Sequence, residues 1–214
     1  MKVAVIGAGI QGICTAYELA HLGHRVTVFD RNSSAAEEAS FANGSLMSAY
    51  ATTSVLDHVG LASLIRSKFK GQSVLQWQGV SPALMRWAYQ GRKLRQSAVG
   101  VSRRKDLLEL AQISRDHLAQ LCNTLRFDID HSEGLMLLMR NGEEQRRWAP
   151  LLQEMSEWGV EAQTLEAEQA QTIEPALRSD TAFEQAVLLS EDSSANCRQF
   201  GLLLKARAEE MGVE

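Results

Sequence analysis

The feature that most constrains the fold of this chain is a glycine-rich turn near its amino terminus. The turn Gly7-Ala8-Gly9-Ile10-Gln11-Gly12 directly follows an apolar run at residues 3–6, and residues 11–22 then show helical periodicity. A second run, residues 25–29, is rich in β-branched side chains and ends at Asp30. Strand, glycine turn, helix and strand in this order predict the βαβ unit of an α/β, Rossmann-like fold.

The glycines of this turn have separate physical roles in binding a dinucleotide. Gly7 permits the tight turn, Gly9 lets a pyrophosphate approach the backbone, and Gly12 lets helix and strand pack closely. The phosphates then lie at the helix N-terminus, where unpaired N–H groups and the helix dipole favour anions. Asp30 is placed to bond a ribose 2′-hydroxyl and to repel the 2′-phosphate of NADP. This spacing does not distinguish FAD from NAD, and a glycine turn without a ligand is the alternative.

The charge of the chain is unevenly distributed. The net charge is −4 over 214 residues, yet residues 58–105 contain ten Lys and Arg and no acidic residue. Aromatic and apolar side chains lie among these basic residues, which are Arg66, Lys68, Lys70, Arg86, Arg92, Lys93, Arg95, Arg103, Arg104 and Lys105. A solvated helical face is the simpler interpretation of this block. Contact with an anionic membrane surface is the alternative, and nothing else in the sequence favours nucleic acid.

Cysteine and histidine spacing sets limits on other kinds of site. Cys14, Cys122 and Cys197 are odd in number and far apart, which favours a reducing, cytoplasmic compartment over a disulfide framework. The histidines lack the spacing of metal ligands, so no metal site is expected. No run of about 18 apolar residues is present, so no transmembrane helix is expected.

The remainder of the chain alternates predicted helices with short apolar runs. Residues 31–54 have the composition of a loop. The patterns predict a helix over 102–125 with Ser102 as its N-cap, strands over 127–130 and 134–140, a turn at Asn141-Gly142, a helix over 143–158, an apolar run at 186–189, a polar loop at 190–196 and a helix over 197–211. The final segment, ARAEEMGVE, repeats the order of ELAHLGHRV, namely the end of a helix, a glycine and the first residues of a strand. The chain is therefore expected to stop where a strand begins.

Residues 31–50, RNSSAAEEASFANGSLMSAY, resemble the segment after the second strand in flavoproteins of the D-amino acid oxidase type, and especially the small subunit of D-amino acid dehydrogenases. The segments SRRKDLLELAQISRDHLAQL, EGLMLLMRNGEE, IEPAL and LLSEDSSANCRQF follow the order of that family. The resemblance implies a Rossmann-like FAD-binding domain with an inserted α+β substrate domain that contains an antiparallel sheet. It divides this chain into an FAD-binding unit with a flavin-contacting loop (1–60), a partial substrate domain (61–185) and a return segment (186–214).

The same resemblance implies FAD as cofactor and oxidation of D-amino acids or related amines to imino acids. These hydrolyse to 2-oxo acids and ammonia, and the electrons pass to a respiratory acceptor such as a quinone, which suits a peripheral position on the cytoplasmic face of the inner membrane. Gly7, Gly9 and Gly12 would then hold the pyrophosphate and Asp30 the ribose, with Arg31 among the cofactor contacts. Ser40, Asn43, Gly44 and Ser45 would lie along the flavin end of FAD, or could form a polar loop of Asx-turns.

Catalytic residues are not assigned, because the family holds substrate with groups expected beyond residue 214. The chain is therefore expected to be an N-terminal part that is inactive alone. Two other interpretations stay open. An NAD-dependent dehydrogenase would normally continue with further βα units after Asp30, whereas a long loop follows here. A non-catalytic fragment that binds only the ADP moiety is the second.

Overall fold

The computed structural model describes residues 1–48, 81–95 and 97–214, and these residues form two compact units. Unit 1 comprises residues 1–47, 117–133 and 193–214, and unit 2 comprises residues 48–116 and 134–192. In the part of the chain that the structure describes, no helix is long and apolar enough to span a bilayer. Residues 58–80 of the basic block, with Arg66, Lys68 and Lys70, lie outside the described residues.

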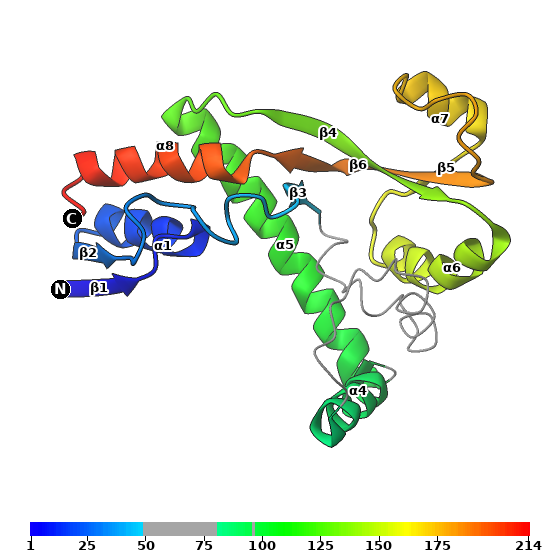
Figure 1. Ribbon diagram of the computed structural model, residues 1–214, viewed down its shortest axis with the longest axis horizontal. Helices are drawn as coiled ribbons and strands as arrows, with labels where there is room; N and C mark the ends of the chain where they lie inside the picture. The colour runs from blue at the N-terminus through cyan, green and yellow to red at the C-terminus, as the bar shows by residue number, and fades with distance from the viewer. Residues whose placement is uncertain (49–80, 96) are drawn as a thin grey trace. The chain divides into compact units, whose positions relative to one another are not determined.

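The predicted βαβ unit is confirmed at the start of unit 1. Strand β1 (Lys2–Ile6) is followed by helix α1 (Ile10–His21) and strand β2 (Arg25–Phe29), and the two strands pair in parallel from Lys2↔Arg25 to Ile6↔Phe29. Helix α1 ends before Gly23, whose positive φ of 81° suits glycine at the end of a helix. Figure 1 shows α1 running back beside the two strands, as a βαβ connection requires.

Helix α8 (Cys197–Glu210) packs beside α1 in unit 1 (Figure 1). Buried side chains of both helices, including Ile13, Ala16, Phe200 and Leu204, form one core with Val26 of β2. The C-terminal part of helix α5 (Ala98–Leu125) adds partly buried apolar side chains to the same core. Two elements of the βαβ unit, α1 and β2, and two distant helices, α5 and α8, thus fix the position of the glycine turn, whose Ala8 belongs to the same core.

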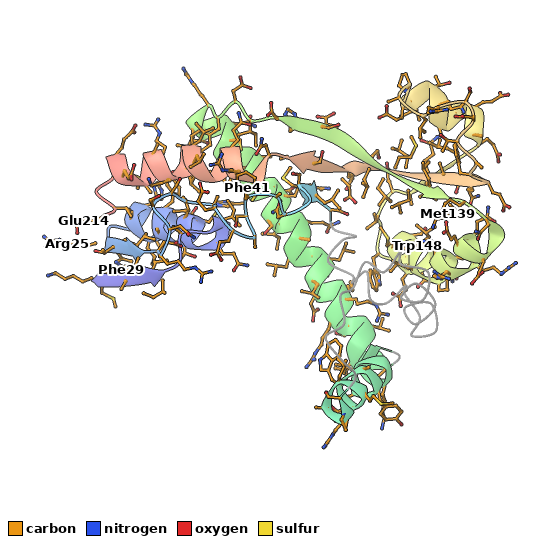
Figure 2. All side chains as sticks on the ribbon, viewed as in Figure 1. Arg25, Phe29, Phe41, Met139, Trp148 and Glu214 are labelled. Carbon is orange, nitrogen blue, oxygen red and sulfur yellow. The ribbon has the colours of Figure 1, made fainter. Side chains whose placement is uncertain are left out.

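The last residue, Glu214, lies beside β2, on the edge away from β1 (Figure 2). Its N–H donates to the Val26 carbonyl at 3.0 Å, and its carbonyl accepts from the Val28 N–H at 2.6 Å. The backbone groups of Arg25 and Phe29 form hydrogen bonds on the side of β1. Those of Val26 and Val28 point to the opposite edge of β2, where they bond to Glu214. Glu214 therefore pairs with β2 as the start of a third parallel strand would.

Unit 2 contains most of a small sheet with helices packed against it. Strand β6 (Gln185–Ala195) pairs with β4 (His131–Met139) and, antiparallel, with β5 (Gln163–Leu165). Helix α6 (Gly142–Glu157) and α5 share a core with this sheet, in which Leu108, Met139 and Met155 are buried. Helix α7 (Ala167–Ile173) packs on a second cluster around Leu165, and helix α4 (Pro82–Arg95) precedes α5. Within unit 1, the far end of β6 pairs with β3 (Leu46–Met47).

Residues 127–130 do not form the predicted strand. The chain leaves α5 through Arg126 at a positive φ of 53°, and Phe127 and Ile129 then pack on the core of unit 1. The Gln199 side chain takes the backbone hydrogen bonds that a strand partner would otherwise take, accepting from Asp130 N–H and donating to the Asp128 carbonyl. Local alternation of side chains cannot anticipate this partner, because Gln199 is about seventy residues away.

Three other local predictions are also wrong. Asn141 is the N-cap of α6 and not part of a turn, because its side chain accepts from the N–H groups of Glu143 and Glu144. Helix α5 begins at Ala98, where the Ser97 hydroxyl accepts from Gly100 N–H, so Ser102 lies inside the helix. The polar residues 190–195 belong to β6, whose Ser193 and Ser194 pair with β3.

Candidate cofactor site

The turn between β1 and α1 has a backbone shape that requires glycine at two positions. Gly7 has a φ of 105°, which L side chains rarely adopt, and its N–H donates to the Phe29 carbonyl at 2.7 Å. A Cβ on Gly12 would lie 1.9 Å from the Gly7 carbonyl oxygen. Helix α1 can therefore approach the strands this closely only because Gly12 has no side chain.

The N-terminus of α1 presents backbone N–H groups, and its own first turn contains no acidic side chain. Gly9 is the N-cap and supplies no side chain. The first N–H groups of any helix lack partners within the helix, and they attract anions together with the helix dipole. Here the Ile10 N–H donates to Ser40 Oγ at 3.0 Å, and a Cβ on Gly9 would lie 3.3 Å from that oxygen. Ser40 thus lies directly over the glycine turn.

Asp30 connects the end of β2 to the glycine turn. One carboxylate oxygen accepts from Ala8 N–H at 2.6 Å, and the other accepts from Asn32 N–H at 2.7 Å. These backbone N–H groups, that of Ala8 first, hold the pKa of the Asp30 carboxyl below its ordinary value. Asp30 is therefore ionised at neutral pH, and its carboxylate can accept a further hydrogen bond.

The segment after Asp30 folds back onto the turn. Ala36 has a φ of 58° and donates its N–H to the Ala8 carbonyl at 2.9 Å, so the two backbones are directly joined. Arg31 pairs with Glu38, with its Nε 2.8 Å from the carboxylate, at the exposed surface. Of the predicted contacts, the structure thus brings Asp30 and Ser40 to the glycine turn and directs Arg31 to Glu38.

Asn43, Gly44 and Ser45 form a turn of their own. The Asn43 side chain accepts from Ser45 N–H at 3.0 Å, as in an Asx-turn, and Gly44 and Ser45 both have positive φ. Burial raises the pKa of the Cys197 thiol at the start of α8, and a hydrogen bond with the Asn43 side chain opposes that shift. The turn therefore lies against the N-terminus of α8.

Three residues near the site were not anticipated from the sequence. Arg198 pairs with Glu37 at 3.0 Å, and its guanidinium carbon lies 4.7 Å from the ring centroid of Phe41. Figure 2 shows Phe41 beside the first turn of α8. No local pattern could have indicated this contact, because 161 positions separate Glu37 from Arg198. Among the described residues, no cluster of three His, Cys, Asp or Glu side chains could hold a metal ion.

Comparison with known proteins identifies the family of the chain. Residues 2–214 match the FAD dependent oxidoreductase (DAO) family. D-amino acid dehydrogenase of Cereibacter sphaeroides is 30% identical over 217 residues, covering 100% of this chain and 50% of that protein. The chain thus spans about half the length of the curated relatives that it matches.

Solved structures show the same α/β fold. Glycine oxidase from Bacillus cereus has a TM-score of 0.65 at 22% identity, covering 100% of this chain and 45% of that one. L-alpha-glycerophosphate oxidase from Mycoplasma pneumoniae, solved with FAD bound, has a TM-score of 0.57 at 15% identity, with 100% and 43% covered. The glycine turn, the parallel β1–β2 pair and the match over nearly the whole length agree: the chain belongs to the FAD dependent oxidoreductase (DAO) family.

Proposed function

We propose that the protein, with FAD, oxidises D-amino acids or closely related amines to imino acids, which water converts to 2-oxo acids and ammonia. The family match and the 30% identity to D-amino acid dehydrogenases support this substrate class. In such a reaction the substrate loses a hydride from its α-carbon and a proton from its nitrogen. Bound FAD supplies the acceptor for the hydride, and a respiratory acceptor such as a quinone then takes the electrons.

The residues at the glycine turn fit the ADP part of FAD. The N-terminus of α1 is the observation that carries the proposal. Ser40 Oγ accepts from Ile10 N–H at 3.0 Å, which leaves the Ser40 hydroxyl hydrogen and the other N–H groups of the first turn as donors to a pyrophosphate. We assign the pyrophosphate to the turn Gly7, Ala8, Gly9, Ile10, Gln11 and Gly12 together with the Ser40 hydroxyl. The N–H groups of Gly7 and Ala8 already donate to Phe29 and Asp30, so these two residues shape the turn and are not phosphate donors. Asp30, whose carboxylate can accept a further hydrogen bond, would accept a ribose hydroxyl and disfavour a 2′-phosphate.

Asn43, Gly44 and Ser45 are assigned to the flavin side of the cofactor, because they follow Ser40 along the chain and lead into β3. Arg31 stays among the cofactor contacts, although its pairing with Glu38 means that binding would have to share or replace that ion pair. Its exposed position makes the exchange inexpensive, since exposed ion pairs contribute about 0–1 kcal/mol.

The proposed domain division is residues 1–60 for FAD binding, 61–185 for part of an inserted substrate domain, and 186–214 for the return to the FAD domain. Two buried clusters separate from the core of unit 1, one around Met139 and Met155 and one around Leu165, support a substrate domain with its own core. The antiparallel pairing of β5 with β6 supports the expected type of sheet.

We further propose that α4 contacts an anionic membrane surface. Trp87 and Tyr89 are 62% and 70% exposed, Met85 is also exposed, and the helix carries Arg86 and Lys93 and no acidic residue. Exposed aromatic and basic side chains on one helix suit an interface with acidic lipid.

Sedimentation of the protein with acidic vesicles tests this proposal. The bound fraction should fall as salt rises, and it should fall further after Arg92, Lys93 and Arg95 are changed to Glu. Binding that does not depend on salt would contradict this proposal.

The visible absorption spectrum of the purified full-length protein tests the cofactor. We expect a yellow protein with a flavin spectrum, and we expect Asp30→Ala to lose flavin. Glu143→Ala is a control, because this exposed carboxylate lies in the first turn of α6 in unit 2. A colourless protein that binds NAD would overturn the FAD proposal.

A second assay tests the substrate class. We expect the protein to reduce an artificial electron acceptor with D-amino acids but not with the L-enantiomers.

A further inference from the structure

Arg198, the second residue of α8, contacts the loop that carries Ser40. Its Nη2 lies 3.0 Å from Glu37 Oε1, and its guanidinium carbon lies 4.7 Å from the centroid of the Phe41 ring. Glu37 and Phe41 stand on either side of Ser40 in the sequence. We call Arg198 with Glu37 and Phe41 the Arg198 clamp.

The loop is also held at its beginning. Ala36 N–H donates to the Ala8 carbonyl at 2.9 Å, and a Cβ on Gly201 would lie 3.6 Å from both Ala36 Cβ and Ile10 Cδ1. Ala36 has a φ of 58°, a conformation that costs free energy for a residue other than glycine. Contacts at both ends are therefore needed to keep Ser40 Oγ at 3.0 Å from Ile10 N–H.

Helix α8 itself gives no reason for an arginine at position 198. A cation in the first turn of a helix is disfavoured by the helix dipole, and Asn196 already caps this helix by accepting from Gln199 N–H. The Arg198 Nε is buried and makes no hydrogen bond to any described residue, which is a further cost. The contacts with Glu37 and Phe41 are what offset both costs.

We propose that Arg198 is a positioning residue for the cofactor. Through Glu37 and Phe41 it fixes the loop 36–41, so that the Ser40 hydroxyl is already in place at the N-terminus of α1 when the pyrophosphate binds. This proposal rests on the proposed function, because it assigns the bound anion to FAD. Arginine suits the role because one planar group both pairs with a carboxylate and stacks on an aromatic ring.

The test uses the full-length protein and the variants Arg198→Met, Arg198→Lys and Lys205→Met. Lys205 pairs with Glu209 at 3.2 Å on the same helix with similar exposure, so Lys205→Met is the matched control. Flavin fluorescence gives the Kd for FAD, and hydrogen exchange of the cofactor-free protein reports the order of loop 36–41. Thermal unfolding shows whether each variant is folded, and Glu37→Gln replaces Arg198→Met if the latter does not fold.

We expect Arg198→Met to raise the Kd for FAD roughly 5- to 30-fold and to speed exchange in loop 36–41. Arg198→Lys should fall between the wild type and Arg198→Met, and Lys205→Met should change neither quantity. In a Ser40→Ala background, Arg198→Met should have little further effect on the Kd, because the two residues act through one contact. Effects that add independently, or an unchanged Kd and exchange rate, would overturn the proposal.

The two proposals fail in different ways. A wild-type protein that binds no FAD overturns the proposed function and the cofactor role of Arg198 together. Unchanged exchange in Arg198→Met, with FAD still bound by the wild type, overturns the clamp alone.

Discussion

At the residue scale, the tightest constraint in the molecule is the absence of a side chain at Gly12. A Cβ there would meet the Gly7 carbonyl oxygen at 1.9 Å, and because this oxygen belongs to the backbone, no side-chain rotation relieves the contact. We expect Gly12→Ala to destabilise the protein by at least about 1–3 kcal/mol and to abolish FAD binding. Gly91→Ala is the control, because nothing lies within 4 Å of its Cβ position in α4. That change should stabilise by about 0.4–1 kcal/mol, and equal effects of the two changes in denaturant unfolding would contradict the packing argument.

A second residue-scale prediction concerns the ionisation of Asp30. Its pKa is below the ordinary value because Ala8 and Asn32 donate backbone N–H groups to the charged form. The stability that this carboxylate contributes is therefore fully present above the unfolded pKa of about 3.9 and is lost as pH falls through the lower folded pKa. The free-energy difference between wild type and Asp30→Asn should be constant above about pH 5 and shrink below it. A difference that stays constant to pH 2 would show that Asp30 is not held in this way.

At the scale of the element, α6 shows how one polar side chain decides where a helix begins. Asn141 accepts from the N–H groups of Glu143 and Glu144 at 3.1 and 3.0 Å, which satisfies donors that the helix cannot satisfy itself. We expect Asn141→Ala to lower the free energy of unfolding by about 0.5–2 kcal/mol. Asn123→Ala, at an exposed position near the end of α5, should have an effect near zero. Equal losses in the two variants would argue against capping.

The elements also show which predictions local sequence supports. The order β1, α1, β2 follows from features within about thirty residues, namely the glycine turn and the β-branched runs, so it was predicted to within a residue or two. The pairing of β6 with β3 and the bonding of residues 127–130 to Gln199 depend on partners far away in the sequence. A polar run such as Ser193-Ser194 has the composition of a loop, and only a partner strand makes it part of a sheet.

The candidate site likewise contains residues that local sequence predicts and residues that depend on distant partners. Gly7, Gly9, Gly12 and Asp30 follow from the motif, because each acts within the βαβ unit. Ser40 was expected from family resemblance at the flavin end of FAD, whereas its hydroxyl lies at Ile10 N–H, beside the glycine turn. Arg198 could not be predicted, because neither its spacing nor its helix position indicates a partner in the loop after β2.

At the scale of the whole molecule, the β1–β2 pair is covered on one face and open on the other. Val26 is buried in the core with α1 and α8, whereas the register partners Ile6 and Phe29 are 82% and 55% exposed. Parallel sheets are normally covered on both faces, and exposed apolar patches favour association. The relatives are about twice as long as this chain, so they contain residues that could cover such a face. The open face is therefore the feature from which we predict how residues 1–214 behave.

We therefore predict that residues 1–214 alone retain FAD weakly and do not turn over D-alanine. The reason is that the apolar residues Ile6 and Phe29, at the carboxyl end of the β1–β2 pair beside the cofactor site, are exposed, so we expect self-association through this open face to compete with FAD binding. The chain is assayed with an artificial electron acceptor beside D-amino acid dehydrogenase of Cereibacter sphaeroides, and self-association is measured by sedimentation. Changing Ile6 and Phe29 to Thr should reduce association without restoring turnover. Turnover comparable to that of the Cereibacter protein would show that these 214 residues suffice for the reaction and that covering the open face is not required.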